Sequence, residues 1–183
     1  PKLESSSIKA MRDLSYARIA FSILNPFLKD EIDPQDLETL LEDAYDDRII
    51  PTTVQHVTGE THIMWLSQGP TCSFKDYAAR FFARILNYFL KRSGCRRVVV
   101  VATSGDTGGA VADALHNQER VDNLVFFPKG SITERQRRQM TTLQDNIYAF
   151  EVNGDFDVCQ ALAKQLLGDQ SFARAVFKDA ERF

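Results

Sequence analysis

A lysine in the stretch "PTCSFKDYAARFF" has a position in which its amine could act as a nucleophile. Lys75 lies between Phe74 and Asp76 at the start of an expected amphipathic helix. Ser73 is expected to cap that helix, with Asp76 completing an arrangement like a capping box. An exposed cation in the first helical turn opposes the macrodipole by roughly 0.3–1 kcal/mol, whereas a neutral amine escapes much of that cost. Burial and a positive dipole also favour the neutral amine that attacks a carbonyl. From the residues alone, a solvated lysine and a nucleophilic lysine both stay open.

A second candidate is the glycine-rich stretch "ATSGDTGGAV", which follows an apolar run and opens a helix. Such a helix start directs unpaired N–H groups at a ligand, which suits a carboxylate or a phosphate. The glycine spacing matches neither a Walker loop nor a dinucleotide fingerprint. Asp106 would face an anion unfavourably unless its carboxylate meets a hydrogen-bond donor. The residues that offer a sharp turn, close backbone approach or hydroxyls are Gly105, Gly108, Gly109, Ser104 and Thr107. A glycine-rich turn without a ligand is the alternative.

The elements that would position these motifs fall into two parts, a helical segment over residues 1–48 and an α/β region over residues 49–183. In the first part, Asn25-Pro26 is predicted to end one helix, and Asp33 with Pro34 to begin the next. Two short strands are expected around a turn at Gly59-Glu60, followed by a long helix that ends at Gly94.

The run "RRVVVVAT" is typical of a strand buried on both faces. Helix "AVADALHNQ", strand "NLVFFP", helix "TERQRRQMTTLQ", strand "NIYAFEV" and helix "DFDVCQALAKQLLG" are predicted to follow. This alternation indicates parallel βαβ units with right-handed crossovers. Ligands of such sheets bind where the strands end and the helices begin, which is where "ATSGDTGG" lies.

Composition excludes several classes of protein. The chain has 183 residues, 44% apolar and 26% charged, with a net charge of −3, so no global attraction to nucleic acid or anionic lipid is expected. No apolar run reaches the roughly 18 residues of a membrane span. The odd number and wide spacing of the three cysteines indicate reduced thiols in a cytoplasmic protein. The histidines and cysteines lack metal-ligand spacing, so no metal site is predicted.

The two motifs together, in this order and about thirty residues apart, resemble the threonine synthase family. The resemblance continues through "FFPKGSITERQRRQMTTLQDNIYAFEVNGDFDVCQALAKQ" and covers roughly Thr52 to the end, and the helical segment before it looks like that family's N-terminal region. It implies pyridoxal-phosphate (PLP) enzymes of fold type II, the tryptophan-synthase-β-like fold. The fold class expected is therefore α/β, with parallel βαβ units after a helical N-terminal segment.

The resemblance also implies roles for individual residues. Lys75 would hold the cofactor covalently through its amine and later move protons as the base, and Phe74 would frame the cofactor pocket. Asp106 would lie near the cofactor, and Ser104, Gly105 and Thr107 would bind the substrate. The implied reaction is that of a lyase in threonine biosynthesis, which converts O-phospho-L-homoserine and water to L-threonine and phosphate.

Two alternatives stay open. One is a related phospho-lyase that releases 2-oxobutyrate, and the other is a catalytically silent homologue or fragment that acts through binding. Several basic residues near "PKGSITERQRRQM" lack an aromatic stacking platform, so a solvated helix face is expected there rather than a nucleic-acid site. A homodimer is compatible with the sequence, which does not fix the oligomeric state.

Some features of the family have no counterpart in the sequence. These are a glycine-rich cradle for the cofactor phosphate, an Asn-Ser-x-Asn-x-x-Arg stretch for the substrate phosphate, and a serine or threonine near the pyridine nitrogen. The chain begins with Pro1 rather than methionine, and "KDAERF" stops in mid-pattern. We therefore expect the sequence to be an incomplete part of a longer enzyme.

Overall fold

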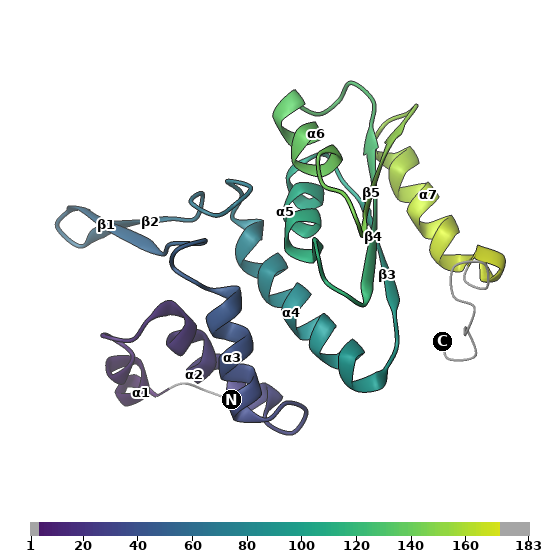
Figure 1. The fold of residues 1–183 in the computed structure, drawn as a ribbon. Helices are drawn as coiled ribbons and strands as arrows, with labels where there is room; N and C mark the ends of the chain where they lie inside the picture. The colour runs from purple at the N-terminus through teal and green to yellow at the C-terminus, as the bar shows by residue number, and fades with distance from the viewer. Residues whose placement is uncertain (1–3, 173–183) are drawn as a thin grey trace. The chain divides into compact units, whose positions relative to one another are not determined.

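The computed structural model describes residues 4–172, so the stretch "KDAERF" lies outside the described residues. The chain divides into two compact units, Pro1–Ile85 and Leu86–Phe183, and each is described by itself (Figure 1). One helix, α4 (Lys75–Ser93), runs through the boundary between them. The predicted division after residue 48 stays a prediction. None of the helices in the described range is long and apolar enough to cross a membrane.

The first unit begins with three helices, α1 (Ser5–Ala10), α2 (Tyr16–Leu28) and α3 (Pro34–Ala44). Ser15 caps α2 by accepting a hydrogen bond from the backbone of Arg18. The predicted helix end at Asn25-Pro26 is wrong, because α2 continues to Leu28. Pro26 removes one backbone donor from α2, but the helix continues beyond it, and the N–H of Lys29 still donates to the carbonyl of Asn25 at 2.9 Å.

Helix α3 has the predicted start. Asp33 accepts a hydrogen bond from the N–H of Gln35 at 2.8 Å, and Pro34 occupies the first helical position. Its inner face buries Leu37, Leu41 and Ala44. The buried Arg80 of α4 donates to the carbonyls of Ala44 at 2.7 Å and Asp43 at 3.1 Å. These bonds satisfy carbonyls at the end of α3 and fix it to the first turns of α4.

Tyrosine rings fill the space between these helices. Tyr16 stands edge-on to Tyr45 and Tyr77, with ring centroids 4.8 and 5.6 Å apart. Tyr77 also donates its hydroxyl to the carbonyl of Pro51 at 3.1 Å. The cluster therefore packs the segment after α3 against the first turn of α4.

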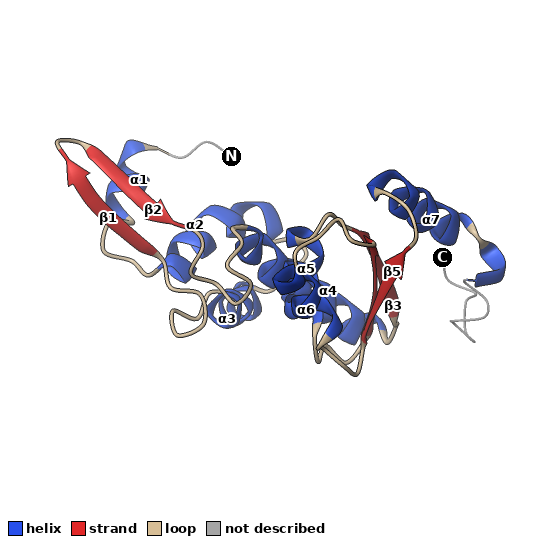
Figure 2. Cartoon of the chain, turned by 90° about the horizontal axis from the view of Figure 1, so that it is seen from above, coloured by secondary structure: helices blue, strands red, loops and turns tan. Residues whose placement is uncertain are grey.

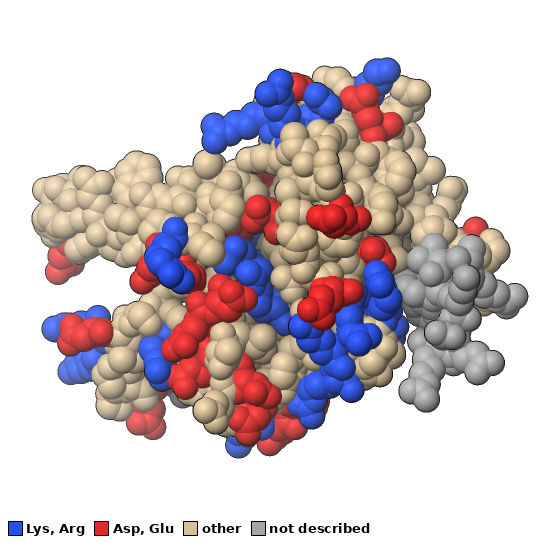
Figure 3. All heavy atoms as spheres, in the orientation of Figure 1, with Lys and Arg blue, Asp and Glu red and all other residues tan. Residues whose placement is uncertain are grey.

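The predicted hairpin is present as β1 (Thr53–Thr58) and β2 (Thr61–Trp65), paired antiparallel around Gly59. Both strands are exposed along their whole length. The surface of the hairpin is largely uncharged (Figure 3).

The second unit contains a parallel sheet, as predicted. Its strands are β3 (Arg97–Ala102), β4 (Val121–Pro128) and β5 (Ile147–Val152), in the order β3-β4-β5. Val125 at the centre of β4 pairs with Val101 on one side and Ala149 on the other. Helices α5 (Asp106–Leu115) and α6 (Glu134–Thr141) cover one face, and α7 (Phe156–Gly168) covers the other (Figures 1 and 2).

Strand β3 differs from its prediction. Every residue from Arg97 to Ala102 is half-buried, so the expected burial on both faces is wrong for the described chain. The reason is its place at the edge of this sheet. The central strand is β4, in which Val121, Val125 and Phe127 are almost completely buried. The carboxyl ends of β3 and β4 are neighbours, which brings the loops before α5 and α6 together.

Candidate active site

Lys75 is the first residue of α4, as the sequence indicates. Its backbone N–H donates to the hydroxyl of Ser73 at 3.3 Å, so Ser73 does provide a cap. The Lys75 side chain is half-buried, and its Nζ lies 4.5 Å from the centre of the Phe74 ring. Phe74 is 63% exposed, which is unusual for a phenylalanine. In such an arrangement, a planar carbonyl compound could react with the amine while it packs against the aromatic ring.

Asp76 does not complete a capping box, and that prediction is wrong. Its carboxylate is 1% exposed and accepts two hydrogen bonds from Thr71, one from the backbone N–H at 3.0 Å and one from the hydroxyl at 2.5 Å. An aspartate reaches less far than the glutamate or glutamine of a capping box. Thr71 offers it two donors at once. The carboxylate thus closes the loop before α4.

Gly69 lies under this carboxylate. A Cβ at residue 69 would sit 2.5 Å from Oδ2 of Asp76, so a side chain there would displace the loop. Cys72 lies between Gly69 and Asp76 in the chain. Its φ is 61°, a left-handed conformation that is unfavourable for a residue other than glycine. We name residues 69–76 the lysine loop. Its strained backbone is held by the buried pair of Thr71 and Asp76.

The second candidate site is the loop after β3, residues 103–109, which we name the glycine loop. The helix that follows has Gly105 as its N-cap, which has no side chain to satisfy the first N–H groups. The buried Thr103 does this instead. Its hydroxyl accepts from the N–H of Gly105 at 3.0 Å and from the N–H of Gly108 at 2.9 Å.

The predicted ligand-binding residues of this loop differ in exposure. Ser104, Asp106 and Thr107 are exposed, whereas Gly105 is buried and has a φ of 131°. The carboxylate of Asp106 accepts a hydrogen bond at 2.7 Å from the side-chain amide of Gln136, which comes from α6. A donor of the kind that the sequence argument required therefore meets Asp106.

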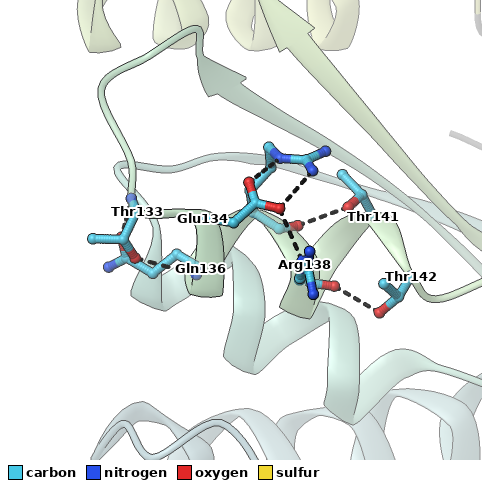
Figure 4. A network of polar contacts seen from close by, with 7 residues as sticks. Thr133, Glu134, Gln136, Arg138, Thr141 and Thr142 are labelled. Atoms are coloured by element: carbon cyan, nitrogen blue, oxygen red, sulfur yellow. Dashed lines mark hydrogen bonds and ion pairs between the residues drawn. The ribbon is translucent and has the colours of Figure 1, made fainter.

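Sequence reasoning missed both Thr103 and Gln136. Thr103 carried no signal beyond its place before the glycines. Gln136 did carry one, because Thr133 and Gln136 have the spacing of a capping box. The structure contains that box: Gln136 Oε1 accepts from the N–H of Thr133 at 2.9 Å, and Thr133 Oγ1 accepts from the N–H of Gln136 at 3.3 Å (Figure 4).

Two basic residues of α6 pair with an acidic residue of the same helix. Arg137 and Arg138 both donate to the carboxylate of Glu134, at 2.7 and 2.8 Å (Figure 4). Their hydrogen bonds lower the pKa of Glu134 to about 2. Basic side chains gather over α6 in the space-filling view (Figure 3). Paired arginines on an exposed helix favour the predicted solvated face, and the expected absence of nucleic-acid binding stays a prediction.

The structure brings Ser104, Gly105, Asp106 and Thr107 together with Gln136 in the second unit. Lys75 and Phe74 lie in the lysine loop of the first unit. Each loop carries exposed polar or aromatic groups and is held in shape by hydrogen bonds that involve a buried threonine. The parallel sheet, with the glycine loop at the carboxyl end of β3, defines the chain as an α/β protein, a class in which ligands commonly bind at the carboxyl ends of parallel strands.

Comparison with known proteins shows which family this chain is similar to. A family model described as "Threonine synthase N terminus" matches residues 1–45. The threonine synthase of Pseudomonas aeruginosa is 35% identical over 179 residues, which cover 95% of this chain and 38% of that protein. The threonine synthase of Saccharomyces cerevisiae is 37% identical over 176 residues, covering 87% of this chain and 34% of that protein.

Solved structures agree with the sequence comparison. The crystal structure of PLP-bound threonine synthase from Brucella melitensis superposes with a TM-score of 0.86 at 34% identity, covering 96% of this chain and 38% of that one. The structure of threonine synthase from Escherichia coli gives a TM-score of 0.82 at 34% identity and covers 96% of this chain and 40% of that one. The chain is therefore homologous to the N-terminal part of the threonine synthase family, and the predicted fold class is confirmed.

Proposed function

We propose that this chain supplies the cofactor-binding lysine and part of the substrate site of a threonine synthase. Such a lyase, dependent on PLP, converts O-phospho-L-homoserine and water to L-threonine and phosphate. The observation that supports the proposal most strongly is the 34% identity and TM-score of 0.86 to a PLP-bound threonine synthase. Because the chain spans 38% of that protein's length, the activity is proposed for the whole enzyme to which these residues would contribute.

The residues present fit PLP. Lys75 offers an amine in the first turn of a helix, with Nζ 4.5 Å from the centre of the exposed Phe74 ring. Lys75 would hold the cofactor covalently through Nζ, Phe74 would frame it, and Asp106 would lie near it. When bound, the cofactor supplies an electron sink that stabilises negative charge on the carbons of the substrate.

The chain's own residues would then bind the substrate and move protons. The hydroxyls of Ser104 and Thr107 are exposed at the N-terminal turn of α5, where the dipole favours a carboxylate or a phosphate. Gly105 gives the loop the backbone conformation that places these hydroxyls. Lys75 Nζ would take a proton from the substrate and return one later.

Reductive trapping tests the lysine. The complete polypeptide, as the cell makes it, is loaded with PLP, reduced with borohydride and mapped by mass spectrometry. We expect the pyridoxyl label on Lys75. Lys75→Ala should abolish label and turnover, whereas Lys91→Ala, which removes a lysine at the other end of the same helix, should keep both. A label on another residue, or none, would refute the assignment.

Product analysis tests the reaction. Threonine and phosphate from O-phospho-L-homoserine support the proposal, and 2-oxobutyrate with ammonia would identify the related phospho-lyase instead. An intact wild-type protein that forms neither product would be the catalytically silent homologue. The three outcomes exclude one another, so a single assay with wild-type protein decides among them.

The proposal includes a cytoplasmic enzyme that acts as a homodimer on a small-molecule substrate. Three widely spaced cysteines support the location, because reduced thiols are usual in the cytoplasm. Light scattering of the complete polypeptide measures the molar mass in solution. A monomer at assay concentrations would refute the homodimer and leave the proposed reaction unaffected.

A further inference from the structure

We infer that Gln136 is a positioning residue for the glycine loop: its side-chain amide holds the carboxylate of Asp106 toward α6 and encloses Gly105. Gln136 was not among the predicted site residues. The effect of Gln136 on substrate binding rests on the proposed function, whereas its effect on the glycine loop does not.

The capping box fixes which way the amide of Gln136 faces. Its Oε1 accepts from the backbone N–H of Thr133 at 2.9 Å, so the oxygen is committed to the start of α6. The amide nitrogen must then point away from Thr133, and it lies 2.7 Å from Oδ1 of Asp106. Exchanging oxygen and nitrogen would set a donor against a donor and an acceptor against an acceptor. The two contacts therefore determine one orientation of the amide.

Gly105 shows how closely the amide is packed. A Cβ at residue 105 would lie 2.5 Å from both Cδ and Nε2 of Gln136, a distance that no real Cβ tolerates. The φ of 131° at Gly105 already requires glycine. The absence of a side chain here thus serves the contact with Gln136 as well as the turn. The amide fits over the backbone of the glycine loop with no room to spare.

Charge explains why a neutral amide is suited to this position. Asp106 is exposed at the N-terminus of α5, beside hydroxyls proposed to receive an anion. An unrestrained carboxylate there would turn toward the anion in some conformations and repel it. The amide of Gln136 donates a hydrogen bond to Oδ1 of Asp106 and so holds that oxygen near α6. Because the amide is neutral, it adds no charge to the site.

Gln136→Glu isolates this contact from the structure of the helix. Glutamate is as good as glutamine in a capping box, so α6 keeps its start. The new carboxylate removes the donor and lies against the carboxylate of Asp106. Gln144→Glu is the matched control, because residue 144 is exposed beyond α6 and the change adds the same charge away from the loop. Gln136→Met, which removes the donor and adds no charge, is the second variant.

The first measurement needs neither cofactor nor activity. Hydrogen exchange of a peptide that spans residues 103–110 is followed by mass spectrometry in the complete polypeptide. We expect about tenfold faster exchange in Gln136→Glu and Gln136→Met than in wild type, the size expected for losing one hydrogen bond to a charged group. Gln144→Glu should exchange at the wild-type rate. Equal rates in wild type and both variants at residue 136 would overturn the inference.

The second measurement uses the proposed activity. The KM for O-phospho-L-homoserine should rise about tenfold in Gln136→Glu, with a smaller change in kcat, and this rise should shrink as pH falls. Two adjacent carboxylates raise the pKa of one of them, and the protonated form can again donate to Asp106. Gln136→Met should show no such recovery at low pH. If wild type forms no threonine, the proposed function fails while the exchange result still decides the inference.

Discussion

The hydrogen bonds between Thr71 and Asp76 yield the sharpest prediction for the lysine loop. Asp76→Ala removes a buried acceptor from two donors, at 3.0 and 2.5 Å. A hydrogen bond to a charged group contributes about 1.5–3 kcal/mol, and stranded donors add a cost. We therefore expect the free energy of opening of residues 69–76 to fall by about 3 kcal/mol. Thr71→Val removes only the hydroxyl donor and should cost about 1.5 kcal/mol by the same rule.

Native-state hydrogen exchange of a peptide that spans residues 66–77 measures these opening free energies in the complete polypeptide. The double variant completes a cycle, whose interaction energy we expect to exceed about 1 kcal/mol because the side chains are in contact. Asp47→Ala, which removes an exposed acid from the same unit, should change opening by less than about 0.5 kcal/mol. Strict additivity of the two single changes would refute the reasoning, since it would mean that the pair does not interact.

Three further predictions concern charge and packing. Hydrogen bonds from Arg137 and Arg138 lower the pKa of Glu134 from 4.5 to about 2. The ion pairs of Glu134 should therefore stabilise α6 fully above pH 4.5, and this stabilisation should be lost as pH falls through 2. NMR titration of the Glu134 carboxyl group measures the pKa. Burial raises the pKa of Tyr45 from 10.0 to about 12. The contribution of the neutral phenol to folding stability should therefore be present below pH 10 and lost as pH rises through 12. Denaturant titrations of Tyr45→Phe should show no such loss. Gly108→Ala would press a methyl group against Thr103 and should destabilise the second unit by about 1–3 kcal/mol in denaturant unfolding, whereas Gly168→Ala, with open space around it, should not.

Local patterns predicted most of the fold. The start of α3 followed from Asp33 and Pro34, and the parallel strands followed from apolar runs that alternate with amphipathic helices. Two predictions failed because they depend on more than the local pattern. Pro26 removes one backbone donor, yet α2 continues through it to Leu28, so the dipeptide alone does not fix where the helix ends. The burial of β3 depends on its neighbours in the sheet, which its own residues do not specify.

The sequence pointed to the exposed residues of the candidate site, whose roles stay predictions, and not to the residues that hold their loops in shape. Types and spacing directed attention to Lys75 and to the hydroxyls of the glycine loop. The residues that hold those loops are Thr71, Thr103 and Gln136, and they were missed. Gln136 and Asp106 are thirty positions apart and meet only because β3 and β4 are adjacent. The capping box formed by Thr133 and Gln136 can be recognised in the sequence and predicts the start of α6. It does not predict that the amide of Gln136 also donates to Asp106.

The glycines of both loops support a common physical explanation. The position of a Cβ at Gly69 is taken by the carboxylate of Asp76, and that at Gly105 by the amide of Gln136. The sequence suggested that Gly105 lets a ligand approach the backbone, yet at Gly105, as at Gly69, a polar side chain of the chain itself fills the space. Asp76 accepts hydrogen bonds from Thr71 within the lysine loop, and Gln136 accepts one from Thr133 at the start of α6. These contacts hold each loop in one conformation, which would lower the entropy lost if a ligand bound there.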